Sequence, residues 1–212
     1  MNPDAFAADL ARKPDVLGRL ADTLERENPW AALVPDGIER VVLLGMGSSA
    51  YAGGVAAARM RARGLVAASE LASSALLPNW GPGTLVVATS ATGGSVETLD
   101  ALGRLPAGVR TVALTNTAGS TITERCDAVV ELLAEREDGG VACRSYQHTL
   151  ALLIALELHL SGLKLRPALA DLKELFRDAE GREHFLPGKL VGVEQSGVDR
   201  FEGELLQFQI VR

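Results

Sequence analysis

The chain is poor in the residues that build disulfide frameworks and metal sites. Among its 212 residues are two cysteines, Cys126 and Cys143, and three histidines. Two cysteines cannot form the set of bridges that holds small secreted domains together, and neither has the neighbours of a zinc site. We therefore expect no metal and no cofactor, and a reducing cytoplasmic location fits this composition.

The chain also lacks a long apolar run. Its most apolar helical stretch, residues 150–156, is interrupted by Glu157 and is too short to span a bilayer. Met1 is not followed by a basic region and an apolar core, so no secretory signal is expected. The net charge of −6 argues against nucleic acid or an acidic membrane as a partner. An anionic ligand must therefore be held by local features.

The remaining composition is that of an ordinary globular protein. Apolar residues make up 47% and charged residues 23%, and the length is sufficient for one α/β domain with a full core. We expect this domain over residues 1–177, with N-terminal helices at 5–26. Residues 178–212 form a C-terminal tail that the pattern assigns to no element.

One strand-to-helix connection organises the sequence. Residues 41–44 form an apolar, β-branched run that is typical of a buried parallel strand. A helical pattern begins at Ala50, and between the two lies the small-residue segment Gly45-Met46-Gly47-Ser48-Ser49. Backbone N–H groups at such a helix start favour an anion, usually a phosphate.

A second connection repeats this design. Residues 84–88 form an apolar run, residues 89–95 are rich in hydroxyl groups and glycine, and residues 96–102 are helical in pattern. Further strands are expected at 65–71, 109–115 and 128–133, and further helices at 145–160 and 165–177. The alternation predicts a parallel sheet covered by helices on both faces, a three-layer α/β/α sandwich. The two loops then face one crevice.

Four segments in order resemble the SIS (sugar isomerase) domain family, and most of all the first SIS half of the isomerase domain of glucosamine-6-phosphate synthase. The segments are Gly47-Ser48-Ser49, residues 90–99, Asn116-Thr117-Ala118-Gly119-Ser120 and Gly140-Val141-Ala142-Cys143. The resemblance implies a five-stranded parallel sheet of flavodoxin-like order. It also implies a sugar-phosphate ligand, a hexose or amino-sugar phosphate, and aldose–ketose isomerisation. The residues that it assigns to substrate binding are Gly47, Ser48, Ser49, Ser90, Thr92, Gly93 and Ser95.

Other functions remain open at this point. The related isomerases have two SIS domains, and the glutaminase nucleophile is absent because residue 2 is Asn. The chain is therefore either an isomerase without a glutaminase domain, or a non-catalytic sugar-phosphate-binding regulatory module or half of a split enzyme. Gly45, Gly47 and Ala50 also fit the dinucleotide fingerprint, with Glu70 as the ribose-binding acid. The serine pair and the matching second loop favour the phosphosugar.

Isomerisation needs a base near C1 and C2 and an acid that opens the ring. Glu97, in the first helical turn after the second loop, and His148, near the start of the long helix, are the catalytic candidates. Glu97 could instead complement the helix dipole. Arg144 could contact an anion or be a solvated surface arginine, and Glu157 is expected at a solvent-facing helix end. One crevice supplies few acid–base groups. We therefore predict a homodimer or larger assembly, in which a neighbouring copy completes the site.

Overall fold

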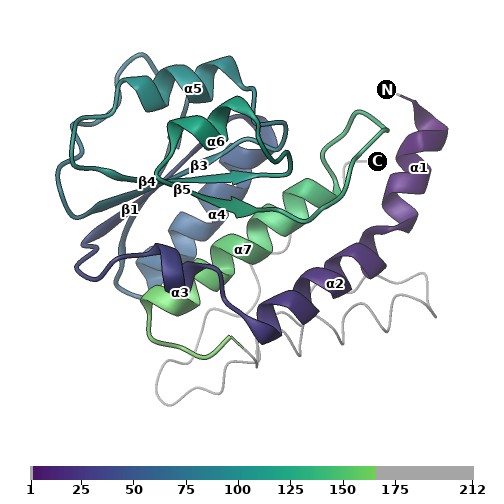
Figure 1. Cartoon of the computed structure of the whole chain (residues 1–212), viewed down its shortest axis with the longest axis horizontal. Helices are drawn as coiled ribbons and strands as arrows, with labels where there is room; N and C mark the ends of the chain where they lie inside the picture. Colours follow the sequence, from purple (N-terminus) through teal and green to yellow (C-terminus); the bar gives the residue numbers. More distant parts are fainter. Residues whose placement is uncertain (1, 166–212) are drawn as a thin grey trace.

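The computed structural model describes residues 2–165, in which every strand from residue 40 onward is followed by a helix except the strand at 66–71 (Figure 1). The expected helix at 165–177, the domain boundary and the tail lie outside the described residues. The helices are α1 (Pro3–Ala11), α2 (Lys13–Arg26), α3 (Trp30–Leu33), α4 (Gly47–Ala62), α5 (Val96–Gly103), α6 (Thr121–Arg125) and α7 (Arg144–Leu160). The strands are β1 (Arg40–Gly45), β2 (Val66–Leu71), β3 (Thr84–Thr89), β4 (Arg110–Thr115) and β5 (Ala128–Glu131).

The strands form one parallel sheet in the order β2-β1-β3-β4-β5, which confirms the expected flavodoxin-like order. The central strand β3 is buried at every position, as its uninterrupted apolar run predicts. Strand β2, which follows β1 in the chain, lies on one side of β1, and the next strand, β3, lies on its other side. In open α/β sheets, ligands bind at the carboxyl ends of the strands on either side of such a reversal, here β1 and β3, where Gly45 lies beside Thr89.

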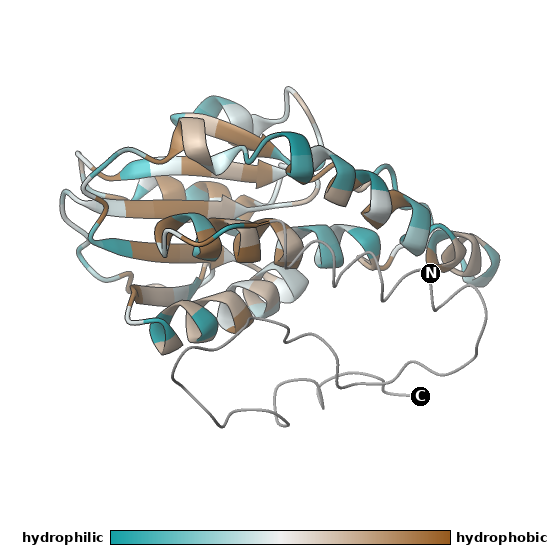
Figure 2. Cartoon of the chain, turned by 90° about the horizontal axis from the view of Figure 1, so that it is seen from below, coloured by the Kyte–Doolittle hydropathy of each residue, from teal (hydrophilic) through white to brown (hydrophobic). Residues whose placement is uncertain are grey.

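Helices cover both faces of the sheet, so the predicted three-layer sandwich is confirmed. Alternate residues of β1 point to opposite faces: Val41 and Leu43 pack with α2, α3, α4 and α7, whereas Val42 and Leu44 pack with α5 and α6. Figure 1 shows α5 and α6 on one side of the strands and α4 and α7 on the other, and Figure 2 shows the strands as the most apolar layer.

The N-terminal helices pack against α7. One apolar stripe of α2 is buried, at Leu17, Leu20 and Leu24. Trp30 of α3 is fully buried, and its indole Nε1 donates a hydrogen bond to the Leu152 carbonyl at 2.8 Å. Helices α3 and α6 did not emerge from the sequence, because each is too short to show helical periodicity.

Glu157 is fully buried, and the expectation of a solvent-facing helix end was wrong. Its carboxylate accepts a hydrogen bond from Arg59 Nε at 2.8 Å and a second, shorter one from Arg63 Nε. Both arginines lie in or next to the last turn of α4. The two guanidinium groups compensate the buried charge and join α4 to α7.

Candidate functional site

The segment that follows β1 is the first turn of α4, not a loop. The helix begins at Gly47, whose φ is +51°, so the left-handed conformation at this position favours glycine. A Cβ at Gly45 would lie 2.9 Å from the Ser49 Cβ, so glycine also permits the close approach of the helix to the strand end. The first N–H groups of a helix have no intrahelical acceptor, but here the Ser49 N–H already donates to the Met46 carbonyl at 3.0 Å, which leaves those of Gly47 and Ser48 at the helix start.

The loop after β3 is held in a tight turn by its own hydroxyl groups. Ser90 is buried, its carbonyl accepts the Gly93 N–H at 3.0 Å, and its Oγ accepts the Ser95 N–H at 3.4 Å. Ser95 caps α5 by accepting the Thr98 N–H at 3.3 Å. Thr92 is exposed and is therefore the hydroxyl of this loop with most access to a ligand.

Gly93 locks this loop onto the next one. Its φ is +68°, and a Cβ there would lie 1.8 Å from Ser120 Oγ. Its carbonyl accepts the Ile122 N–H at 3.0 Å. The glycine of the second motif is therefore required by a close contact with the loop after β4.

The two catalytic candidates lie in different environments. Glu97 is exposed at the start of α5, where its Oε2 accepts a hydrogen bond from Ser95 Oγ at 3.2 Å. His148 is fully buried, and its Nδ1 donates to the Leu132 carbonyl at 2.7 Å, just after β5. Its Nε2 has no hydrogen-bond partner among the described residues. The catalytic roles of both residues stay predictions.

His148 should make stability depend on pH. Burial lowers its pKa and outweighs the hydrogen bond to Leu132, which raises it. Below the unfolded pKa of 6.5 the unfolded chain binds more protons than the folded one, so the free energy of unfolding falls as the pH drops from 6.5 toward the lowered folded pKa. Above 6.5 this contribution is fully present.

The measurement is urea unfolding at pH 7.5 and about pH 5.5. The wild type should lose more stability between these values than His148→Gln, by up to about 1.4 kcal/mol per pH unit. His159→Gln, on the same helix, is the matched control. Equal losses in wild type and His148→Gln would contradict the prediction.

The start of α7 is occupied by a carboxylate of the chain itself. Glu137 accepts the N–H groups of Cys143 at 2.7 Å, Arg144 at 2.6 Å and Ser145 at 3.3 Å. Burial raises the pKa of Glu137, but the hydrogen bonds from Ser145, Cys143 and Arg144 outweigh it, so the pKa is lowered. This role of Glu137 was not predicted from the sequence, because its partners are backbone N–H groups at the start of α7, six to eight residues later.

Arg144 is neither an anion ligand nor a surface residue, so both sequence interpretations were wrong. It is fully buried and forms an ion pair with Asp9 Oδ1 at 3.0 Å. It also donates to the carbonyls of Ala134 at 3.0 Å and Asp9 at 3.1 Å. The residue fastens the start of α7 to α1 and to the segment after β5.

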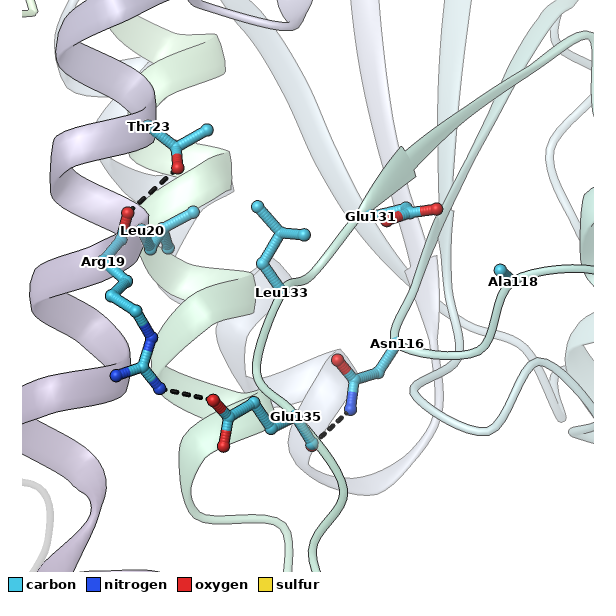
Figure 3. A pocket seen from close by; sticks show the side chains of 8 residues that line it. All are labelled: Arg19, Leu20, Thr23, Asn116, Ala118, Glu131, Leu133 and Glu135. Atoms are coloured by element: carbon cyan, nitrogen blue, oxygen red, sulfur yellow. Dashed lines mark hydrogen bonds and ion pairs between the residues drawn. The ribbon is translucent and has the colours of Figure 1, made fainter.

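A separate cavity of about 440 Å³ lies between α2 and the ends of β4 and β5 (Figure 3). It is lined by Arg19, Leu20, Thr23, Asn116, Ala118, Glu131, Leu133 and Glu135. Figure 3 shows the Arg19 guanidinium directed at the Glu135 carboxylate, with which it forms an ion pair. None of the predicted substrate-binding residues lines this cavity, so the crevice between β1 and β3 is a different place on the same edge.

Within residues 2–165, no group of acidic, histidine and cysteine side chains could hold a metal ion. No helix of this part of the chain has the length and apolar character needed to cross a membrane.

Comparisons with known proteins agree with this architecture. Residues 37–158 match the family defined by the SIS domain. Over 206 residues the chain is 27% identical to a glutamine–fructose-6-phosphate aminotransferase of Leifsonia xyli. The matched region covers 92% of this chain and 33% of that protein. Over 102 residues it is 33% identical to the enzyme of the same name from Halobacterium salinarum. This matched region covers 46% of this chain and 17% of the Halobacterium protein. The chain thus spans a third or less of the length of these relatives.

A solved structure has the same fold. The tagatose-6-phosphate ketose/aldose isomerase of Escherichia coli superposes with a TM-score of 0.62 at 16% identity, over 82% of this chain and 53% of the isomerase. At this identity the likeness concerns the fold alone.

Proposed function

Since the chain belongs to the SIS domain family, we propose that it binds a phosphorylated sugar, a hexose or amino-sugar phosphate, in the crevice between β1 and β3. One observation carries the proposal. Gly45 and Thr89 end neighbouring strands, and each leads into a helix whose first turn opens on the same edge. Two helix starts with serine and threonine hydroxyls between them form a surface suited to phosphate.

The proposed ligand contacts fall into two groups. From the start of α4, Gly47 and Ser48 offer N–H groups, and Ser48 and Ser49 offer hydroxyls. On the other side, Thr92 contacts the ligand directly, whereas Ser90, Gly93 and Ser95 give the loop its shape through the contacts described above. The start of α7 is a poor competing site for the phosphate, because Glu137 already accepts its N–H groups.

The proposed reaction is aldose–ketose isomerisation, as the isomerase part of a glutamine–fructose-6-phosphate aminotransferase would perform it without a glutaminase domain. A base moves a proton between C1 and C2 through an enediol. Glu97 is the proposed base, because it is the exposed carboxylate beside the β3 loop. His148, with its unpartnered Nε2, is the second proposed catalytic group.

The test is isothermal titration with fructose 6-phosphate and glucosamine 6-phosphate, with nicotinamide dinucleotides as competing ligands. Thr92→Ala should weaken sugar-phosphate binding by about tenfold or more, since a hydrogen bond to a charged group is worth about 1.5–3 kcal/mol. Ser90→Ala should weaken it as well, because the β3 loop loses the acceptor of the Ser95 N–H. Thr121→Ala, an exposed threonine on α6, is the control and should bind normally. Absence of binding to any sugar phosphate would contradict the proposal, and binding of a dinucleotide would favour an oxidoreductase.

A second candidate is a sugar-phosphate-binding module without catalysis, either a regulatory unit or half of a split enzyme. The scarcity of acid–base groups supports it, because Glu97 is the one titratable side chain within residues 89–99. Binding without turnover would favour this candidate, and measurable isomerisation would remove it.

We further propose that the protein acts as a homodimer or larger homo-oligomer, in which a neighbouring copy supplies missing acid–base groups. A cytoplasmic location without nucleic-acid or membrane partners accords with the charge and the composition. Light scattering during the titrations measures the assembly, and turnover by a monomer would contradict it.

A further inference from the structure

Asn116, directly after β4, forms hydrogen bonds with the loops on both sides of it. Its backbone N–H donates to the Ala91 carbonyl in the β3 loop at 3.0 Å. Its side-chain Oδ1 accepts the Ala134 N–H at 2.9 Å, and its Nδ2 donates to the Glu135 carbonyl at 2.6 Å (Figure 3). A side-chain amide suits this position because it offers a donor and an acceptor together.

The contact with the β3 loop is reinforced by the residues on either side of Asn116. Thr115 Oγ1 donates to the Ala91 carbonyl at 3.3 Å, and Thr117 Oγ1 donates to it at 3.2 Å. Three donors therefore converge on one carbonyl. Ala91 directly precedes Thr92, so the position of this peptide group decides where the Thr92 hydroxyl lies.

The other side of Asn116 meets a strained segment. Leu133 and Glu135 both have a φ of 55°, in the left-handed region that residues with a Cβ seldom adopt. Such a conformation persists where the surrounding structure holds it. The Asn116 amide binds the Ala134 N–H and the Glu135 carbonyl, and the Glu135 carboxylate forms ion pairs with Arg12 and Arg19. The segment is thus fixed to the N-terminal helices.

We propose that Asn116 is a positioning residue of the sugar-phosphate site, which holds the β3 loop against the segment 133–135 and so sets the place of Thr92. The ligand named here rests on the proposed function, whereas the effect on the loop does not. Asn116 acts through Ala91, because both hydrogen bonds described for its side chain go to the segment 133–135 and its backbone N–H binds the β3 loop.

The experiment compares Asn116→Asp with Asn79→Asp. Aspartate keeps the shape and the acceptor for Ala134 but loses the donor to Glu135, and Asn79 is an exposed control without a described hydrogen bond. Amide hydrogen exchange should become about tenfold faster at residues 92–95 in Asn116→Asp and stay unchanged in the control, as expected for loss of one fixed hydrogen bond. Affinity for fructose 6-phosphate should fall by a similar factor while the protein stays folded.

A merely structural Asn116 would give a different result. Exchange would then rise at residues 134–135 alone, with residues 92–95 and the affinity unchanged, and this outcome overturns the proposal. If the wild type binds no sugar phosphate, the proposed function fails, but the exchange data still decide the positioning role. If Asn116→Asp does not fold, Asn116→Ser removes the same amide donor to the Glu135 carbonyl without adding a charge. Faster exchange at 92–95 in that variant supports the proposal, and unchanged exchange overturns it.

Discussion

Replacing Arg59 and Arg63 together by methionine should lower the free energy of unfolding by about 3–5 kcal/mol, the usual cost of leaving a buried charge without its partner. Glu157 is fully buried, and the hydrogen bonds described for its carboxylate come from these two guanidinium groups. Methionine preserves most of the aliphatic packing of each arginine, so the loss reports the unpaired carboxylate. Urea unfolding at pH 7 measures it.

Two further variants make this prediction specific. Adding Glu157→Met to the double variant should restore most of the stability, because well-packed apolar residues often replace a buried ion pair at no cost. Arg125→Met, an exposed arginine on α6, should change stability by less than about 0.5 kcal/mol. If the double variant is as stable as the wild type, water or other donors reach the carboxylate, and the pair is not what joins α4 to α7.

Gly93→Ala should have the second large effect, with an expected loss of about 2–5 kcal/mol. A left-handed conformation costs a residue with a Cβ about 1–2 kcal/mol, and overpacking adds about 1–3 kcal/mol. Both terms apply, because φ is +68° and the added Cβ would lie 2.4 Å from the Ser120 Cβ as well as against its hydroxyl. Sugar-phosphate binding should weaken too, because the β3 loop must move away from the β4 loop.

The chain offers a matched control that separates the two terms. Gly119 has a φ of +67°, but an added Cβ there would meet no atom within 4 Å. Gly119→Ala should therefore lower the free energy of unfolding only by the cost of the left-handed backbone, about 1–2 kcal/mol. The double variant Gly93→Ala with Ser120→Gly should remove the clash and regain the stability lost to it. It should still lose the hydrogen bond from Ser120 Oγ to the Thr117 carbonyl. Equal losses for Gly93→Ala and Gly119→Ala would show that the contact with Ser120 is unimportant.

The elements that follow from the sequence are those that bury a continuous apolar pattern. The runs at 41–44 and 84–88 are strands, and the stripe at Leu17, Leu20 and Leu24 is the buried face of α2. The order of the sheet came from the likeness of four loop motifs to the SIS family, and the topology confirms it. Local pattern alone predicts parallel strands but does not order them.

The predictions that failed concern side chains whose partners are distant in sequence. Glu157 follows an apolar run, which locally indicates a helix end, but its arginine partners lie 98 and 94 residues away. Arg144 pairs with Asp9, and nothing near either residue indicates this contact. The helical state of Gly47 and Ser48 was missed for another reason: their propensities are low, and packing of α4 on β1 overrides them.

The positions of Trp30 and Asp9 have a consequence for synthesis on the ribosome. Trp30 finds its carbonyl partner 122 residues later in the chain, and Asp9 binds the Gly139 N–H 130 residues later. The N-terminal helices are made first but acquire their packing surface only after α7 has emerged. Until then the apolar stripe of α2 remains in water for several seconds at ordinary elongation rates, about 5–20 residues per second. Nascent chains that stop before residue 150 should therefore be the form of this protein that chaperones bind.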